Sequence, residues 1–555
     1  MIVQSEQTKQ ALDMTDTIST RRATPNGWRI RWDEPLAAQA YADGWWRTDS
    51  CADALVRVAH EDPDRILIID GDTRLSAATL YDQASRLAQA MLARFVPGNV
   101  VSFMLPNWHE AAVIYMGATL AGMVANPILP SLRDHDLHFT LADVGTRMIF
   151  VPQTFRGHDY VAMLDRVAAT MAQPPEIMVV RGDAGDHIPY NQLLEEGGTA
   201  PLPAIDADEV RMVMYTSGTT GRPKGVVHTH NSLNALIRQI GAHWLVEPGD
   251  RFLVPSPISH IGGSIYAFEA PLLLGSTAIL MEAWNPVDAV GIMVDQRCTH
   301  MAGATPFLQG LLAAAREADT RLPDLKLFIC GGASVPPALI REASATFDRA
   351  IVSRVYGSTE VPVTTVGVIG GADGEGADID HAAETDGRPG IATVIIAEDG
   401  EIRARGPQMM LGYFREEDDL SGFDAQGYYR TGDQGAWVDG DYLVVTGRIK
   451  DLIIRNGENI SPKEIEDLLS DHPAIAEIAI VGIPDPRTGE RAIAVIVPRD
   501  GAMPDVAAIG DYLSEQGVAR FKYPEGVVLW DALPKNDAGK VLKQAIRTRL
   551  TQPAI

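Results

Sequence analysis

The chain has 555 residues, of which 46% are hydrophobic and 22% charged, as in an ordinary folded globular protein. Its formal net charge of −26 argues against nucleic acid or an anionic membrane as a partner, because both would repel it. At about 150 residues per domain, this length predicts three or four structural units. Cys51, Cys298 and Cys330 show neither disulfide nor metal spacing, which indicates a reducing, cytoplasmic location.

The first 200 residues show the patterns of an α/β protein. Residues 1–30 are polar and lack periodicity, so we expect a mobile extension there. From residue 52 onward, helical patterns alternate with short apolar runs such as 65–70 and 100–105, which predicts largely parallel sheets. The uncharged run 111–129 is about long enough to cross a bilayer, but its glycines and Asn-Pro pair favour a core helix followed by a strand. We expect neither a signal peptide nor an integral membrane segment.

Residues 215–230, YTSGTTGRPKGVVHTH, join an apolar run to a helical pattern over residues 231–240. Glycines let the backbone approach a phosphate, hydroxyl groups donate hydrogen bonds, and Lys224 supplies a positive charge. A lone glycine-rich turn would indicate only a flexible loop. The spacing differs from the G-x-x-x-x-G-K-S/T loop, because Pro223 precedes the lysine and Gly225 follows it. The stretch therefore predicts a polyphosphate-binding loop of another kind.

This string resembles the signature of the adenylate-forming superfamily, which includes acyl-CoA synthetases, aryl-CoA ligases, peptide-synthetase adenylation domains and luciferases. Further segments match it in the expected order: SPISHIGGS (256–264), LKLFICGGASVPP (325–337), IVSRVYGSTE (351–360), YYRTGD (428–433), GRIKDLIIRNGENISPKEIE (447–466) and PKNDAGKVLK (534–543). The resemblance covers residues 50–550. It implies an α/β fold with a large N-terminal domain over 31–448, built of stacked, mostly parallel sheets and a β-barrel-like subdomain. A small, mobile C-terminal α/β domain is expected over 449–555, and the acidic stretch 370–386 is expected to be a loop.

The resemblance also assigns roles to individual residues. The expected nucleotide-binding residues are Thr216, Ser217, Gly218, Thr219, Thr220, Gly221, Lys224, Tyr356, Gly357, Ser358, Thr359, Asp433, Arg448 and Lys540. The expected catalytic residues are Lys540, Thr216, Lys224 and Glu360, of which Glu360 and Thr216 would also hold Mg²⁺. The expected acyl pocket contains His260, Ile261, Gly262, Gly331, Gly332, Ala333 and Gly357. Gly457 and Glu458 would line the CoA tunnel, and Lys450 would be the hinge.

Taken singly, each of these residues has a simpler explanation. His260 alone would be structural, Asp433 would form a turn, and Lys540 would be a solvated surface charge. The resemblance instead places Tyr356 against adenine, Thr359 on phosphate and Asp433 on the ribose hydroxyls. It is the ordered set of motifs that favours the functional roles.

The implied activity is that of an ATP-dependent carboxylate–CoA ligase, with ATP, Mg²⁺ and coenzyme A as substrates and cofactors. An amino acid is disfavoured because SPISHIGGSIYA contains no Asp, and a dihydroxybenzoate because Ile261 stands where those relatives have Asn. The segments LMEAWNP (280–286) and HMAGATPFL (300–308) are similar to bacterial cyclohexanecarboxylate and medium-chain acyl-CoA ligases. We therefore expect an apolar acid that is alicyclic, aryl or medium-chain.

Three alternatives stay open. A stand-alone adenylation enzyme would load a carrier protein instead of CoA, and a luciferase-like oxygenase would share the fold without any specific residue in its favour. A non-enzymatic nucleotide-binding regulator would be expected to lack Lys540, Glu360 or Lys224, and all three are present. Analogy with dimeric relatives suggests a homodimer.

Overall fold

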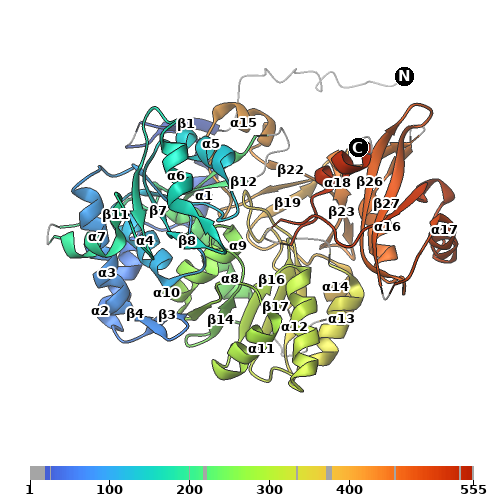
Figure 1. The fold of residues 1–555 in the computed structure, drawn as a ribbon, viewed down its shortest axis with the longest axis horizontal. Coiled ribbons are helices and arrows are strands. Elements are labelled where there is room, and N and C mark those ends of the chain that lie inside the picture. The colour runs from blue at the N-terminus through green and yellow to red at the C-terminus, as the bar shows by residue number, and fades with distance from the viewer. Residues whose placement is uncertain are drawn as a thin grey trace, which may run out of the picture.

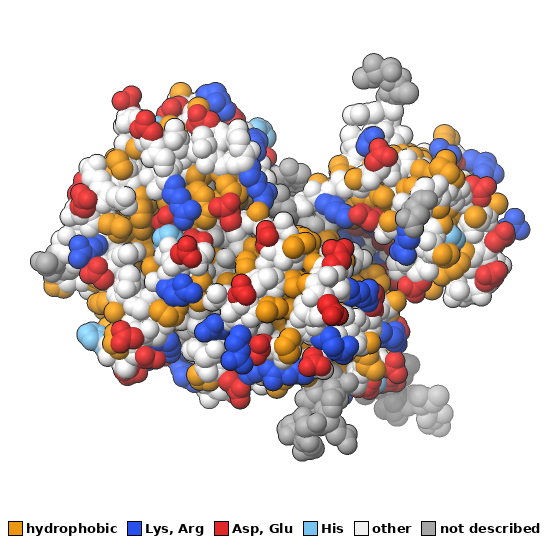
Figure 2. All heavy atoms as spheres, turned by 60° about the horizontal axis from the view of Figure 1, so that its bottom comes forward, with side chains coloured by type: hydrophobic (Ala, Val, Ile, Leu, Met, Phe, Trp, Pro, Cys, Tyr) orange, Lys and Arg blue, Asp and Glu red, His pale blue; other side chains and the backbone are white. Residues whose placement is uncertain are grey.

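The computed structural model describes residues 19–25, 27–198, 201–216, 222–332, 335–369, 378–455, 458–499, 501–536 and 539–552. A large domain, blue to orange in Figure 1, carries a smaller domain, mostly in red, on one side. Every helix among the described residues is too short or too polar to cross a bilayer. Acidic and basic side chains are interspersed over the face shown in Figure 2, so the net negative charge is not gathered into one patch there.

Two mostly parallel sheets form the body of the large domain. In the first, the strand order is β11 (Ile188–Pro189), β10 (Glu176–Val179), β7 (Thr146–Val151), β5 (Val100–Phe103), β6 (Val124–Pro127), β12 (Val210–Thr216), β13 (Lys224–Thr229) and β21 (Gly412–Tyr413). In the second, it is β18 (Ile351–Val355), β17 (Leu327–Gly331), β16 (His300–Gly303), β14 (Arg251–Val254), β15 (Thr277–Leu280), β3 (Ile66–Asp70) and β4 (Thr73–Ser76). Antiparallel pairing occurs at β12–β13–β21 and at β3–β4.

Helices cover these sheets and fill the space between them. They are α1 (Glu34–Ala42), α2 (Cys51–Glu61), α3 (Ala77–Leu92), α4 (His109–Leu120), α5 (Asp134–Val144), α6 (Tyr160–Ala168), α7 (Tyr190–Glu196), α8 (His230–His243), α9 (Ile261–Ser264), the π-helix η1 (Ile265–Glu269), α10 (Ala270–Leu274), α11 (Pro286–Asp295), α12 (Thr305–Glu317), α13 (Pro337–Thr346), α14 (Ile379–Glu384) and α15 (Glu416–Gly422). Residues 111–120 of helix α4 are buried on every side, because the helix packs in one core cluster with strands of both sheets. The run 111–129 is thus a core helix followed by a strand, as predicted.

An antiparallel sheet of β19 (Thr393–Ile396), β20 (Glu401–Arg405), β22 (Tyr429–Val438) and β23 (Tyr442–Arg448) occupies the place of the expected β-barrel-like subdomain. The small domain follows it. Its elements are η2 (Ile449–Asp451), β24 (Ile453–Arg455), β25 (Glu458–Ile460), α16 (Pro462–Leu469), β26 (Ile475–Asp485), β27 (Gly489–Pro498), α17 (Val506–Glu515), η3 (Arg520–Lys522), β28 (Gly526–Leu529) and α18 (Lys543–Thr551). A core of its own, containing Ile465, Ile480 and Ile496, holds it together.

Two local predictions are wrong. Part of the stretch 1–30, expected to be a mobile extension, is instead an ordered hairpin, because β1 (Ser19–Ala23) pairs with β2 (Arg29–Asp33) and Arg21 binds Asp419 at 2.5 Å. The acidic stretch expected as a loop contains α14, whose first turn is capped by Asp378. A short hairpin of β8 (Thr154–Phe155) and β9 (His158–Asp159) completes the described elements. Residues 1–18, 26 and 370–377 lie outside the described ranges.

Candidate active site

The polyphosphate loop connects two antiparallel strands. Thr216 ends β12, Lys224 begins β13, and the two residues are paired across the hairpin. The sequence predicted that the loop leads directly to a helix, but the β-branched run after Lys224 forms a strand first, between β12 and β21. The central loop residues expected to bind phosphate, Ser217, Gly218, Thr219, Thr220 and Gly221, lie outside the described residues.

Carboxylates of α15 hold the two cations at the base of this loop. Arg222 donates to both oxygens of Asp418 at 3.0 and 3.2 Å and to Glu417 at 3.1 Å. The Lys224 ammonium lies 3.6 Å from Asp418. Both Lys224 and Asp418 are buried, so the pair fixes the lysine where the hairpin opens. The sequence analysis missed Asp418, although four consecutive acidic residues mark the first turn of this helix.

Glu360 lies in the loop after β18, at the carboxyl end of the second sheet. Its Oε1 accepts hydrogen bonds from the Tyr413 hydroxyl at 3.0 Å and from the Thr216 hydroxyl at 3.4 Å. The carboxylate is buried, and the neighbouring groups are oxygens. Mg²⁺ prefers carboxylate, phosphate and water oxygens, so Glu360 and Thr216 fit a magnesium ion that arrives with a polyphosphate.

A buried histidine connects the hairpin of β12 and β13, here called the phosphate hairpin, to the loop that carries Glu360. His228 Nε2 lies 2.8 Å from the Thr359 carbonyl, and its Nδ1 lies 3.1 Å from the Ser232 hydroxyl. Burial lowers the pKa of His228 to about 4, so the ring is neutral and can donate through Nε2 while Ser232 donates to Nδ1. The residue next to the Glu360 backbone is therefore tied to β13. The sequence analysis did not single out His228.

Two other expected nucleotide-binding residues contact Asp433, the carboxylate expected to bind the ribose. Asp433 accepts from the Tyr356 hydroxyl at 2.7 Å and pairs with Arg448 Nε at 2.9 Å. Burial, followed by the charge of Asp433, raises the pKa of Tyr356 far above its ordinary value, so the phenol stays a donor. Strand register explains the arrangement, because Asp433 on β22 is the partner of Arg448 on β23.

Lys540 reaches this group from the small domain. Its backbone N–H donates to Asn536 Oδ1 at 2.8 Å, and the neighbouring Gly539 lies so close to Pro306 that an added Cβ would be 3.1 Å from its ring. Burial, and next the charge of Arg448, lowers the pKa of Lys540 to about 8. The lysine also lies near His260, whose pKa is lowered first by partial removal of water from around the ring and then by the charge of Lys540.

The expected acyl-pocket residues adjoin the lysine in part. His260 caps the short helix α9, with its Nδ1 accepting from Gly262 N–H at 3.3 Å, and its side chain keeps solvent-exposed surface. Ile261 is buried behind it. Close packing between strands explains why residue 331 is a glycine, because an added Cβ would lie 2.8 Å from the Val355 carbonyl oxygen on the next strand. Gly332 follows it in a left-handed conformation, and Ala333 lies outside the described residues.

The remaining predicted residues lie where the two domains join or within the small domain. Lys450 is in the single 3₁₀ turn η2 directly after β23, which is the place of a hinge. Glu458 is exposed on β25, next to Gly457, which lies outside the described residues. Ser358 and Gly357 share the Glu360 loop, where the Ser358 hydroxyl accepts from Val361 N–H at 3.2 Å.

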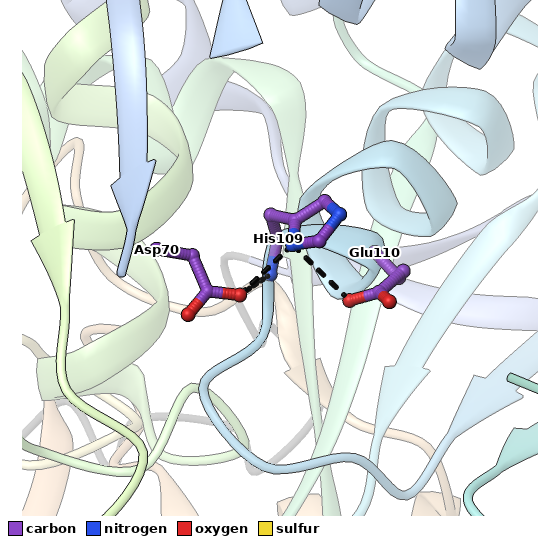
Figure 3. A group of neighbouring side chains, drawn as sticks. All are labelled: Asp70, His109 and Glu110. Atoms are coloured by element: carbon purple, nitrogen blue, oxygen red, sulfur yellow. Dashed lines mark hydrogen bonds and ion pairs between the residues drawn. The ribbon is translucent and has the colours of Figure 1, made fainter. Parts of the chain in front are cut away.

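A second cluster of potential metal ligands lies elsewhere on the large domain (Figure 3). His109 Nδ1 is 2.8 Å from Asp70 and 3.4 Å from Glu110. Arg181 binds both Glu110 oxygens at 2.7 Å and stacks on the Trp108 ring at 3.9 Å. Although burial would raise it, the hydrogen bonds from His109 hold the pKa of Asp70 below its usual value. Both carboxylates already have hydrogen-bond donors, Arg181 on Glu110 and His109 on Asp70, so we interpret the cluster as an ion-pair and hydrogen-bond network at the start of α4.

Comparisons with known proteins agree with this geometry. The model of the AMP-binding enzyme family matches residues 55–414, and that of the AMP-binding enzyme C-terminal domain matches residues 464–540. The chain belongs to the AMP-binding enzyme family. It is 32% identical over 552 residues to a medium-chain fatty-acid–CoA ligase of Escherichia coli, covering 94% of this chain and 95% of the relative.

Two further AMP-binding enzymes extend the comparison. A Rhodococcus jostii CoA ligase for a propanoyl group on a methyl-dioxo-octahydroindene is 32% identical over 513 residues, covering 89% of this chain and 97% of the relative. The ATP-bound structure of MatB from Rhodopseudomonas palustris superposes with a TM-score of 0.78 at 27% identity, covering 90% of this chain and 98% of that one. The expected superfamily, the fold class and the enzyme class of an AMP-forming acid–thiol ligase are thereby confirmed.

Proposed function

We propose that this AMP-binding enzyme activates an apolar carboxylic acid, alicyclic, aryl or medium-chain, with ATP and transfers the acyl group to coenzyme A in the cytoplasm. The observation that carries the proposal is the position of Lys540, which comes from the small domain and follows Gly539, the residue packed against Pro306 of the large domain. Asp433 and Arg448 are near enough for their charges to shift the pKa of Lys540, and Lys540 in turn shifts that of His260. A lysine brought from a separate domain to a ribose-binding carboxylate and a carboxylate pocket suits a reaction at the α-phosphorus of a nucleotide.

In the first half-reaction, a carboxylate oxygen of the acid attacks the α-phosphorus of ATP, the bond to the bridging oxygen breaks, and pyrophosphate leaves. Because phosphoryl chemistry needs little covalent help, the protein contributes position and charge. Lys224 and the hairpin loop would hold the outer phosphates, Asp433 would accept from the ribose hydroxyls, and Lys540 would approach the α-phosphate. Magnesium held by Glu360 and Thr216 would neutralise phosphate charge.

In the second half-reaction, the CoA thiolate attacks the acyl-adenylate carbonyl and AMP leaves. Lys540 would withdraw as the small domain turns about Lys450, since one face cannot serve both pyrophosphate release and thiol entry. Gly457 and Glu458 would then line the pantetheine tunnel. Replacing Gly457 with Trp should spare adenylation and slow thioester formation. An equal loss of rate in both half-reactions would contradict the assignment of Gly457 to the tunnel.

The proposed acid class rests on two residues of the expected acyl pocket that would offer no charge to a substrate side chain. His260 is uncharged at neutral pH because its pKa is lowered, and it is followed by the apolar Ile261. The medium-chain and ring-bearing acyl groups named for the two sequence relatives belong to the same class.

The test incubates the protein with ATP, Mg²⁺, CoA and a panel of octanoic, cyclohexanecarboxylic, benzoic and amino acids, and follows AMP and acyl-CoA by mass spectrometry. We expect AMP and the CoA thioester from the apolar acids. Acyl-AMP without thioester would favour a carrier-protein acceptor, and no turnover with any acid would contradict the proposal. We also propose a homodimer by analogy with relatives, which light scattering would test.

A further inference from the structure

Tyr413 lies between the two charges expected to contact magnesium-bound ATP, although the sequence assigned it no role. It is 4% exposed on the short strand β21, where it is the partner of Val226 on β13. Its N–H donates to Asp419 Oδ1 at 2.7 Å, and the next residue, Phe414, donates to the Gly225 carbonyl at 2.7 Å. The ring is therefore fixed relative to the strand that begins with Lys224.

The two parts of the side chain contact different charged groups. The hydroxyl donates to Glu360 Oε1 at 3.0 Å, and the ring centroid lies 4.8 Å from the Lys224 ammonium. A second phenol, Tyr429, has its oxygen 3.1 Å from the Tyr413 oxygen. Together with the Thr216 hydroxyl, Tyr413 restricts the rotation of the Glu360 carboxylate.

A carboxylate and an ammonium in a buried site attract each other strongly. Among the described residues, however, Lys224 pairs with Asp418, while Glu360 binds hydroxyl groups. The aromatic ring stabilises the cation through its face and the anion through its hydroxyl. It thus allows both charges to stay near the phosphate hairpin without pairing with each other.

We propose that Tyr413 is a positioning residue for magnesium-bound ATP, with its hydroxyl aiming the Glu360 carboxylate at the metal and its ring holding Lys224 toward the phosphates. The proposal rests on the proposed function, because it needs ATP at this hairpin. It makes two separable predictions: the hydroxyl acts only when the metal is present, and the ring acts with or without it.

The test measures binding of α,β-methylene ATP by calorimetry in Mg²⁺ and in EDTA. The methylene group between the α- and β-phosphorus atoms cannot leave, so the analogue binds without transferring its AMP group. For Tyr413→Phe, which keeps the ring, we expect the Kd to rise about tenfold in Mg²⁺ and to stay within about twofold in EDTA, as for loss of a group that orients a metal ligand. Tyr413→Leu should weaken binding in both conditions. Tyr160→Phe, which removes another buried phenol whose hydroxyl donates to the Pro130 carbonyl at 2.8 Å, should leave the Kd unchanged in both conditions.

An unchanged Kd for Tyr413→Phe in Mg²⁺, or an equal rise in both conditions, would overturn the proposal. If Tyr413→Leu does not fold, Tyr413→Phe alone decides, since it retains the packing of the ring. Failure of the wild-type protein to bind the analogue in either condition would instead contradict the proposed function, so the two failures are distinguishable.

Discussion

The two sides of the candidate active site are held in different ways. On the large domain, each buried site residue has a partner on a neighbouring element. Tyr413 donates to Glu360, His228 binds the Thr359 carbonyl, and Asp418 pairs with Lys224. Lys540 comes from another domain, and its loop is held locally through Asn536. In Figure 1 the small domain lies beside β23, and the 3₁₀ turn η2, directly after that strand, joins the two domains. The difference suggests a rigid phosphate cradle and a lysine that can leave it.

Removing the lysine should separate the two half-reactions most strongly. Lys540→Ala should slow adenylation by two to three decades, about 3 kcal/mol, by analogy with the loss of one preorganised charge donor. Thioester formation from supplied acyl-AMP should change little if Lys540 withdraws before that step, as proposed. Single-turnover assays of each half-reaction measure both rates. Lys535→Ala, which removes a nearby lysine paired with Glu477, is the control. Equal losses in both half-reactions would argue against a movable lysine.

Disturbing the cradle should affect the stability of the large domain as well as ATP binding. His228→Leu leaves the buried Thr359 carbonyl without its donor and should cost about 1–3 kcal/mol, measured by chemical denaturation. His228→Gln, which can donate again, should recover part of the loss. His243→Leu, at an exposed position at the end of α8, should have little effect. A His228→Leu protein as stable as the wild type would contradict a stabilising role for the His228–Thr359 hydrogen bond.

The charge on Lys540 should make adenylation pH-dependent. Its pKa is lowered to about 8, so the protonated form is lost as the pH rises through that value, and kcat/KM should fall about tenfold per unit above it. Bound ATP favours the charged lysine, so kcat should decline at higher pH than kcat/KM. Lys540→Arg should move the decline upward, because a guanidinium stays protonated. A kcat/KM profile that is flat to pH 10 would contradict a required ammonium.

The smallest effect is expected away from both regions, at the His109 network. Asp70→Asn should change the free energy of unfolding by less than about 1 kcal/mol, as is usual for partly exposed ion pairs, and should leave activity unchanged. Titration with Zn²⁺ or Mn²⁺ should give the same response in wild type and variant. Stoichiometric metal binding that Asp70→Asn abolishes would show that the network in Figure 3 is a metal site.

The site residues that could be predicted from the sequence are those that stand inside short, contiguous motifs. Glu360 follows the buried strand β18 and Asp433 lies on β22, and each stands in a contiguous, specific string, so both could be singled out from the sequence. Tyr413, His228 and Asp418 could not be identified in this way, because their contacts depend on strand register and on helix α15 lying beside the hairpin. The hairpin strand β13 was missed for a related reason: its apolar run fits a strand or the start of a helix until its pairing partners are known.

Acid-dependent exchange of labelled pyrophosphate into ATP tests the central claim most directly. We predict exchange that requires an apolar carboxylic acid, needs no CoA and nearly disappears in Lys540→Ala. The absence of exchange with every acid in the panel, or exchange equally fast in the variant, would contradict an acyl-adenylate formed between the phosphate hairpin and Lys540.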